Sequence, residues 1–450
     1  MPIERTTERT AERTTARTRR SKALAAAATT LVGALLITSC STASSGANGA
    51  SASDGKTHLT VSLFGTFGYE EAGLFDEYQK QNPDVTIQYE STQGESTYWP
   101  ALQTKLASGN GAADVQGIEV GRIADVVANQ GDEWTDLKGT AAGEQVANYP
   151  TWKSAAATTE DGKVLAVGTD IGPMALCYRS DLLGQAGLPT DPAQLAAKMG
   201  SWDDYLALGR EFKGKAAAGT AWTDSAGGLY NAIISTQEEI YYDASGKLVW
   251  NSNPAVKKAF DTSATAATEG LTAKLDQFND PAWDKGFGGG AFATIACPSW
   301  MVGYIKGKAG DAGSGKWNIT SLPGGAGGNW GGSYLGIPKS SKNTEAAAKL
   351  VKWLTDPEQQ AKVFEVGGNF PSNTKAFDLV SGATDEYFQG APIGKIFSDA
   401  AQSAPTQVLG PKDAVVKTSL VQSLLSVETN GVSPADAWQA ASKDLANQIG

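Results

Sequence analysis

The stretch from Thr57 to Ser91, THLTVSLFGTFGYEEAGLFDEYQKQNPDVTIQYES, decides the fold of this chain. Its opening, THLTVSLF, alternates along the chain and is rich in residues that favour strands, which predicts a β-strand. Apolar side chains then recur at helical spacing in LFDEY, and Pro83 follows the point where that helix should end. VTIQYES, at the end of the stretch, has the pattern of a second strand.

The same alternation of strand and helix continues beyond this stretch. YWPALQTKLASG predicts a helix and DVQGIEV predicts a third strand. Strand–helix–strand–helix–strand implies parallel pairing in an open α/β sheet. Because ligands bind at the carboxyl ends of such strands, we expect a binding site at residues 64–69, 91–98 and 119–122.

A second α/β pattern starts near Gly168. MALCYRSDLLGQAGLP reads as a strand and a short helix, SWDDYLALGREFKG as an amphipathic helix, and GFGGGAFATIACPSW as a buried strand. LVWNSN predicts a further short strand, and the residues after NFPSN predict helices up to the C-terminus. The sequence therefore predicts two α/β units.

The N-terminus has the order of a secretory signal. It is basic, residues 23–39 carry no charge, and small residues precede Cys40. A permanent membrane-spanning helix is an alternative, but this uncharged run is at the lower limit for crossing a bilayer. The Ser/Gly-rich residues 40–56 predict a flexible tether.

The residues before Cys40 read Ile37-Thr38-Ser39 and resemble the lipobox of bacterial lipoproteins. This resemblance implies that residues 1–39 are a signal peptide that is cut off, and that the Cys40 thiol carries a diacylglyceryl group with fatty acids such as palmitate. We then expect the body of the protein in water, outside the cytoplasm and anchored to the cell membrane by its lipidated N-terminus.

The charge of the chain excludes several kinds of partner. Residues 1–39 contain seven Lys and Arg and three Glu, so their removal changes the formal net charge from −11 to −15. An acidic surface of this kind argues against nucleic acid or anionic lipid as a partner, and against an anionic ligand.

Histidine and cysteine, on which most zinc sites and many catalytic triads depend, are rare in this chain. His58 is the only histidine and the cysteines are scattered, so we expect no metal site and no His-dependent catalytic triad. GDAGSGKW has Trp317 where a phosphate-binding loop needs Ser or Thr, so we expect no nucleotide cofactor. Cys177 and Cys297 both lie in strand-like runs, and either a disulfide or two buried thiols fit an exported protein.

Several motifs, taken in their order along the chain, resemble the family 1 extracellular solute-binding proteins of carbohydrate ABC transporters, which include the maltodextrin-binding proteins. The motifs are LTVSLFGTFGY, KLASGNGAADVQGIEVGRIADVV, GAFATIACPSWMVGYI and GGSYLGIPKSSKNTEAAAKLVKWLTDPEQQ. The resemblance implies two α/β lobes, joined by a multi-segment hinge, with the ligand held in a central cleft. It assigns residues 57–168 and 333–380 to lobe 1, and residues 169–332 and 385–450 to lobe 2.

The same resemblance implies which residues face the ligand. They are Thr66 and Phe67 after the first strand, Glu119 after the third, Asp170 at the first crossing between lobes, Trp222 and Tyr230 in lobe 2, and Trp300 after the buried strand. Phe67 stands where the maltodextrin binders would have a Lys, so the ligand is expected to differ. Arg122 is expected to form a salt bridge.

The aromatic residues support a sugar ligand on chemical grounds. A pyranose ring has apolar faces that stack on aromatic rings and a rim of hydroxyls that suits carboxylates. Trp330 lies between glycines in GGNWGG, where helical periodicity does not explain an indole, so it is a further candidate for contact with the ligand.

These observations predict a monomeric, non-enzymatic lipoprotein that captures a neutral di- or oligosaccharide by lobe closure and delivers it to the membrane permease of an ABC importer. Cello-oligosaccharides are the first candidates. The alternatives are a surface-anchored glycoside hydrolase, because the many carboxylates could include a catalytic pair, and a sugar sensor or adhesin without a transport role.

Overall fold

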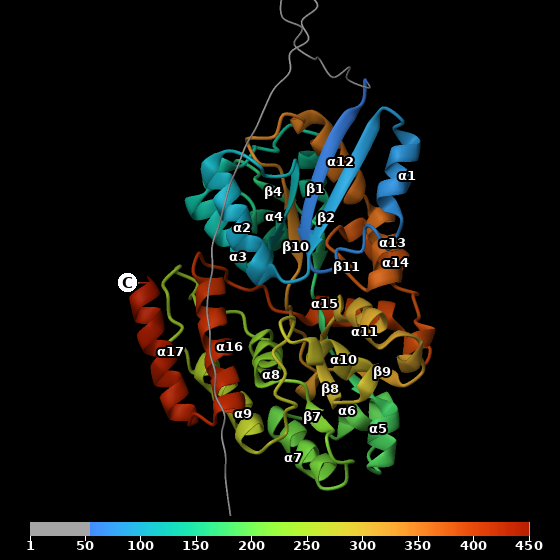
Figure 1. The fold of residues 1–450 in the computed structure, drawn as a ribbon, viewed down its shortest axis with the longest axis vertical. Coiled ribbons are helices and arrows are strands. Elements are labelled where there is room, and N and C mark those ends of the chain that lie inside the picture. Colours follow the sequence, from blue (N-terminus) through green and yellow to red (C-terminus); the bar gives the residue numbers. More distant parts are fainter. Residues whose placement is uncertain (1–54, 450) are drawn as a thin grey trace, which may run out of the picture. The chain divides into compact units, whose positions relative to one another are not determined.

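The computed structural model describes residues 55–449, in which two β-sheets form the centres of two lobes (Figure 1). The predicted signal peptide, Cys40 and all but the end of the predicted tether lie outside the described residues. Among residues 55–449, no helix combines the length and the apolar character needed to span a bilayer.

The first sheet has the strand order β2-β1-β3-β10-β4. Its strands are β1 (Thr57–Phe64), β2 (Val85–Thr92), β3 (Val115–Glu119), β4 (Ala166–Gly168) and β10 (Ser333–Gly336). β1 pairs in parallel with β2 and β3, as the strand–helix–strand pattern predicts. β10 lies antiparallel between β3 and β4, so a strand from late in the chain joins two from its first half.

Helices cover both faces of this sheet. Leu59, Val61 and Leu63 alternate along β1 and are at most 1% exposed, in a core shared with α1 and α12. On the opposite face, Ile118 packs with residues of α2 and α3. The helices in this part of the chain are α1 (Leu74–Gln81), α2 (Glu95–Ser108), α3 (Val120–Asn129), α4 (Thr151–Ala156), α12 (Thr344–Leu354), α13 (Pro357–Gly367) and α14 (Phe377–Val380).

The second sheet has the strand order β7-β8-β6-β9. Its strands are β6 (Met174–Arg179), β7 (Ala221–Thr223), β8 (Phe292–Pro298) and β9 (Trp317–Thr320). β6 runs antiparallel to β8 and β9, and β7 runs parallel to β8. All residues of β6 and β8 are buried, which explains why both strands read as continuous apolar runs.

Helices from the middle and the end of the chain surround this second sheet (Figure 1). They are α5 (Ser180–Gln185), α6 (Pro192–Ala197), α7 (Trp202–Lys213), α8 (Ala226–Ile234), α9 (Pro254–Thr268), α10 (Pro281–Gly289), α11 (Met301–Ala309), α15 (Ile393–Ser403), α16 (Asp413–Asn430) and α17 (Pro434–Ile449). LVWNSN forms no strand: Leu248 makes only an isolated bridge with Tyr242, because its neighbours turn into α9.

A two-stranded ladder lies where the chain crosses between the two sheets. β5 (Asp170–Ile171) pairs antiparallel with β11 (Phe370–Pro371). α13, which precedes β11, contributes Val363 to the core of the first sheet and Phe364 to a core of the second. Short 3-10 helices connect other elements: η1 (Gly131–Glu133), η2 (Ala142–Asn148), η3 (Gly310–Gly313), η4 (Pro323–Gly325), η5 (Thr374–Ala376) and η6 (Glu386–Phe388).

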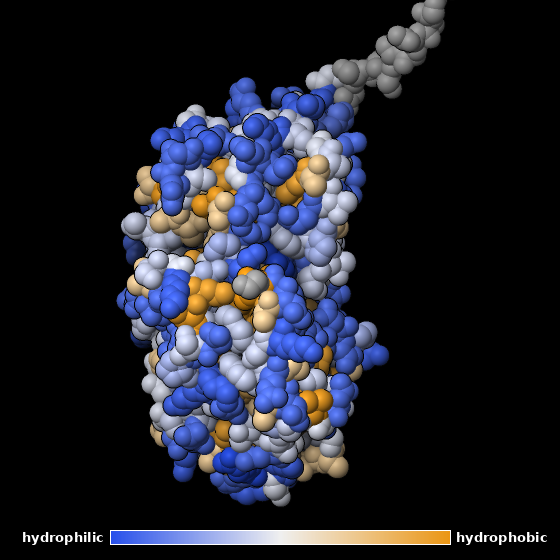
Figure 2. Space-filling model, turned by 90° about the vertical axis from the view of Figure 1, so that its left-hand side faces the viewer, coloured by the Kyte–Doolittle hydropathy of each residue, from blue (hydrophilic) through white to orange (hydrophobic). Residues whose placement is uncertain are grey.

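Hydrophilic residues predominate on the face of the protein shown in Figure 2, and apolar residues form small groups there. Among residues 55–449, the large apolar side chains that are well exposed are Val366 and Leu379. This is the pattern of a surface that faces water.

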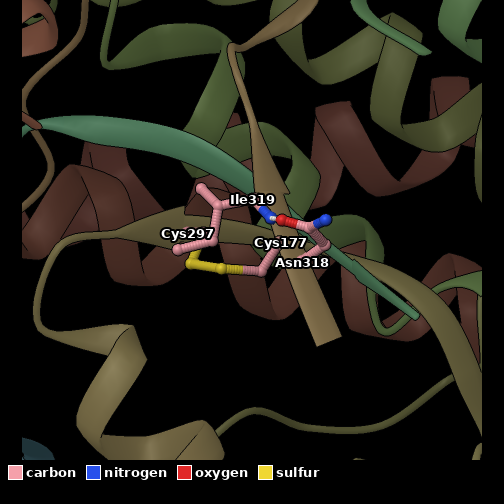
Figure 3. Close-up of a disulfide and its surroundings, with 4 residues drawn as sticks. All are labelled: Cys177, Cys297, Asn318 and Ile319. Carbon is pink, nitrogen blue, oxygen red and sulfur yellow. Dashed lines mark hydrogen bonds between the residues drawn. A yellow bond between two sulfur atoms is a disulfide. The ribbon is translucent and has the colours of Figure 1, made fainter. Parts of the chain in front are cut away.

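A disulfide joins Cys177 on β6 to Cys297 on β8, with the Cα atoms 5.3 Å apart (Figure 3). Both residues are fully buried in a core that also contains Trp317 and Ile319 of β9. The bond connects neighbouring strands of one sheet across 120 residues of sequence.

Replacing both cysteines, Cys177→Ala with Cys297→Ala, should lower the free energy of unfolding by about 4 kcal/mol, because the bond closes a long loop in the unfolded chain. Chemical denaturation of the two proteins measures this difference. Thiol titration of the unfolded wild-type body should find neither of these cysteines free, and two reactive thiols would contradict the disulfide.

Candidate functional site

A cavity of about 280 Å³ lies between elements of the first sheet and elements of the second. Loops at the ends of β1, β2 and β3 contribute to one side of it, as expected for an α/β sheet. The main polar and aromatic residues that line it are Phe64, Thr66, Phe67, Gln93, Glu95, Glu119, Arg122, Asp170, Asn231, Asp276, Gln277, Phe278, Trp300, Tyr304, Trp330, Asn369, Lys417 and Glu428.

The loop after β1 brings two predicted residues to the cavity, Thr66 and Phe67. Gly65 has a φ of 56°, and a Cβ at this position would lie 2.8 Å from the Tyr304 hydroxyl of α11. The turn therefore needs glycine both for its conformation and for this close approach. Asn369 fixes the loop by donating a hydrogen bond to the Thr66 carbonyl (3.2 Å). Phe67 lines the cavity but is only 6% exposed, so little of its ring is open to a ligand.

Two ion pairs line the side of the cavity next to β3. Glu119 caps α3 by accepting a hydrogen bond from the Gly121 amide (2.6 Å), and its carboxylate lies 3.7 Å from Lys417 of α16. Arg122 donates two hydrogen bonds to Glu95 (2.9 and 3.3 Å), so the predicted salt bridge is present. Both positive charges in this region are thus partly neutralised by carboxylates.

Asp170 is the most buried of the predicted polar site residues, with 6% of its surface exposed. Its Oδ1 accepts hydrogen bonds from the Thr169 hydroxyl (2.7 Å) and the Ser333 amide (2.9 Å). Burial raises the pKa of this carboxyl, while the nearby charge of Lys153 acts to lower it. Asp170 therefore presents a positioned carboxylate at the crossing between the two sheets.

Aromatic rings from the second lobe form one wall of the cavity. Trp300 and Trp330 meet edge to face, with ring centroids 5.7 Å apart and planes at 80°. The Trp300 indole donates a hydrogen bond to the Trp330 carbonyl (3.0 Å), which holds its orientation. Tyr304, four residues after Trp300 on the next turn, lies 5.9 Å from the Trp300 ring, and burial raises its pKa to about 12.

A loop that the sequence did not single out completes this wall. Lys274 and Phe278 both have positive φ values, 61° and 67°, which are rare for residues with side chains. The Phe278 ring lies 6.1 Å from that of Trp300. The fully buried Asp224 anchors the loop: it accepts hydrogen bonds from Gln277 (2.7 Å) and from the Trp283 indole (2.9 Å).

Helix α16 supplies the remaining wall, a role that no motif in the sequence indicates. Lys417, Gln422 and Glu428 face the cavity from different turns of the helix. Glu428 is 3% exposed and accepts a hydrogen bond from the Ala226 amide at the start of α8 (2.7 Å). Burial raises the pKa of Glu428 to about 7.

Two of the predicted ligand-facing residues are not at the cavity. Trp222 and Tyr230 are both 0% exposed and belong to the core of the second lobe. Trp222 packs against Tyr205 and Phe212 of α7, and the Tyr230 hydroxyl pairs with that of Tyr241. Ser225 caps α8, and residues 225, 227 and 231 of this segment line the cavity instead.

Among the described residues, no group of three or more His, Cys, Asp and Glu side chains is arranged to hold a metal ion. The cavity combines a wall of aromatic rings with carboxylates, amides and two cations. Such a site can bind a polyhydroxylated molecule through ring faces and hydrogen bonds.

Comparisons with known proteins agree with this architecture. The arabinooligosaccharide-binding protein of Bacillus subtilis (strain 168) is 26% identical over 394 residues, which cover 81% of this chain and 84% of that protein. The lactose-binding protein of Rhizobium radiobacter is 26% identical over 264 residues, covering 55% of this chain and 59% of that protein, so this match spans less than two thirds of the relative's length.

A crystal structure of a family 1 extracellular solute-binding protein is 39% identical, with a TM-score of 0.73, and the match covers 87% of this chain and 100% of that one. This similarity agrees with the predicted α/β fold of two lobes around a cleft. A family model described as bacterial extracellular solute-binding protein matches residues 73–390. That match covers well over half of the 450 residues, and the chain therefore belongs to the family of bacterial extracellular solute-binding proteins.

Proposed function

We propose that this protein captures a neutral di- or oligosaccharide outside the cytoplasmic membrane and delivers it to the permease of an ABC sugar importer. The observation that carries the proposal is the aromatic wall formed by Trp300, Trp330, Tyr304 and Phe278 in a cavity that also holds carboxylates. The names of the relatives, which bind lactose and arabino-oligosaccharides, support a sugar as the ligand.

The energetics favour several stacked rings. Covering roughly 100 Å² of a pyranose face at about 25 cal/mol per Å² yields about 2.5 kcal/mol for one aromatic ring. A micromolar ligand needs about 8 kcal/mol net of the costs of association. Two or three aromatic contacts, together with hydrogen bonds to carboxylates such as Asp170, reach this range.

The charges around the cavity favour a neutral ligand. Arg122 and Lys417 are each paired with a carboxylate of the cavity, Glu95 and Glu119. Further carboxyl groups, those of Asp170, Asp276 and Glu428, line the cavity as well. An anionic sugar would meet this acidic excess, and the two cations that line the cavity, Arg122 and Lys417, are already paired. The volume of about 280 Å³ lies at the lower end for small-molecule sites, which favours a short saccharide; cello-oligosaccharides are the first to test.

In this proposal the protein binds the saccharide and does not catalyse a reaction on it. Glu95 and Glu119 are engaged in ion pairs, and Glu119 also caps α3, so both carboxylates already have partners within the protein. The relatives are likewise named as binding proteins. A glycoside hydrolase would release monosaccharide from an oligosaccharide, so analysis of the products after long incubation separates the two functions.

Lobe closure would report the bound state to the permease. Contacts already bridge the two sides of the cavity: Lys417 approaches Glu119, and Gln93 donates a hydrogen bond to Asp284 of α10 (3.5 Å). A sugar that touches both sides adds to these contacts only in the closed form, so binding shifts the open–closed equilibrium. Hinge closure of this kind is general among periplasmic binding proteins.

The N-terminus would keep the protein near its permease. We propose that residues 1–39 are removed, that Cys40 carries the lipid, and that residues 40–56 act as a tether. A tether raises the effective concentration of the protein at the membrane without a new contact. The protein would act as a monomer, with no nucleic acid partner.

Trp300→Ala should weaken binding of the best saccharide by about 2 kcal/mol, or roughly thirtyfold, because a ring face loses its stacking surface. Isothermal titration calorimetry against a panel of oligosaccharides measures the affinity. Trp300→Phe is the matched control, since it keeps an aromatic face and should retain most of the affinity. Equal affinity of wild type and Trp300→Ala would remove Trp300 from the site.

Cys40→Ala should release the protein from the membrane, because the lipid can no longer be attached. Fractionation of cells that express the two forms measures the distribution, and mass spectrometry of the membrane-bound wild type should find a lipidated Cys40 as the first residue. A Cys40→Ala protein that stays in the membrane fraction would instead indicate a spanning N-terminal helix.

A further inference from the structure

Lys153 on α4 is fully buried, with 0% of its surface exposed. Its Nζ atom has no hydrogen-bond partner among the described residues. The amine lies 3.8 Å from the centroid of the Tyr334 ring on β10, a cation–π contact. Burying an amine in this way is costly, and a methionine would fill the same space without that cost. Packing alone therefore does not account for a lysine at this position.

The surrounding backbone is shaped around this side chain. A Cβ on Gly168 would lie 2.9 Å from the Lys153 Cε atom, and a Cβ on Gly332 would lie 3.2 Å from Nζ. The same Cβ on Gly332 would be 2.6 Å from the Asp170 carbonyl. Gly332 and Asp170 both line the cavity, so the amine lies directly behind its wall.

Asp170 is the carboxyl group of that wall whose ionisation is influenced by the charge of Lys153. The hydrogen bonds from Thr169 and Ser333 both go to Oδ1, and the side-chain amide of Asn369, which also lines the cavity, acts on the same carboxyl. The donors stabilise an ionised carboxylate, whereas burial raises the pKa of Asp170 and the charge of Lys153 opposes that rise. When a ligand expels water from the cavity, the burial effect on Asp170 becomes larger.

The other ionisable groups near this pair are few. Glu119 acts on Lys153 from the end of β3, and Tyr334 faces it from β10. Tyr69, in the loop after β1, faces Asp170, and its hydroxyl is buried without a partner among the described residues. Burial raises the pKa of both tyrosines above the ordinary value, so both stay neutral at physiological pH. Burial lowers the pKa of Lys153 to about 8, so at neutral pH its amine is still largely charged.

We propose that Lys153 is a positioning residue whose buried ammonium keeps the Asp170 carboxylate ionised, so that Asp170 accepts a hydrogen bond from a hydroxyl of the bound saccharide. Lys153 does not touch the ligand. This inference rests on the proposed function, because it needs a ligand that donates a hydroxyl to Asp170.

The test compares wild type with Lys153→Met by calorimetry, from pH 5.5 to 7.5, using the saccharide that the wild type binds best. In wild type the affinity should stay nearly constant over this range. In Lys153→Met the affinity should weaken toward pH 5.5, by up to about tenfold for each unit by which the pKa of Asp170 rises once the ammonium is gone. It should recover toward pH 7.5, because the carboxylate is then ionised without Lys153.

Thermal unfolding distinguishes this role from a structural one. Lys153→Met should unfold at the same temperature or higher, since it removes a desolvated amine, while its affinity falls. Asp170→Asn should bind weakly without pH dependence, and adding Lys153→Met to it should cause no further loss. Lys349→Met, an exposed lysine of α12, is the matched control and should change nothing.

The outcomes separate the two proposals. A wild type that binds no saccharide contradicts the proposed function. If the wild type binds and Lys153→Met has the same affinity and the same pH profile, Lys153 has no role in binding. The inference is also overturned if Lys153→Met loses the same affinity at every pH and this loss adds to that of Asp170→Asn. If Lys153→Met does not fold, the wild type alone decides: its affinity should stay nearly constant from pH 7.5 down to 5.5, because the ammonium keeps Asp170 ionised, and an affinity that falls over this range overturns the inference.

Discussion

The ladder of β5 and β11 is the constraint on which the rest of the site depends. Ile171 pairs with Phe370 and Asp170 with Pro371, so two segments far apart in sequence cross between the sheets side by side. The ladder is short, and its residues are almost completely buried. It places Asp170 at the cavity and joins the loops after the strands of the first sheet to the aromatic wall of the second. A connection of this length can act as a hinge, because only a few backbone angles need to change.

The two sides of the cavity differ in chemistry. The first sheet supplies mainly polar groups held by ion pairs and caps, such as Glu119 and Arg122. The second supplies rings that support one another: Trp300 contacts Trp330, Tyr304 and Phe278. A ligand that uses both an apolar face and a polar rim gains its full contacts only when both sides are present. This division explains how one molecule can be recognised by two lobes and why closure would accompany binding.

The sequence predicted the first sheet well because its strands and helices are close in the chain and strongly periodic. Thr66, Phe67, Glu119, Asp170, Trp300 and Trp330 all line the cavity. The prediction was wrong for Trp222 and Tyr230, because the residue type is the same for a stacking aromatic and a core aromatic, and only packing against α7 and α9 separates them. Phe278 and the cavity face of α16 were missed, since each is brought to the site by contacts with distant elements. The sequence also did not indicate that α13 packs against both lobes, because its opposite faces belong to two different hydrophobic cores.

The central claim is that a sugar ring lies against the aromatic wall, between the two lobes, with its hydroxyls directed at carboxylates of the cavity. A crystal structure of the protein with its best-binding saccharide tests this claim most directly. We expect a ring stacked on Trp300 and a hydroxyl within hydrogen-bond distance of Asp170. A saccharide bound elsewhere on the molecule, or a cavity occupied by a ligand of another chemical class, would contradict it.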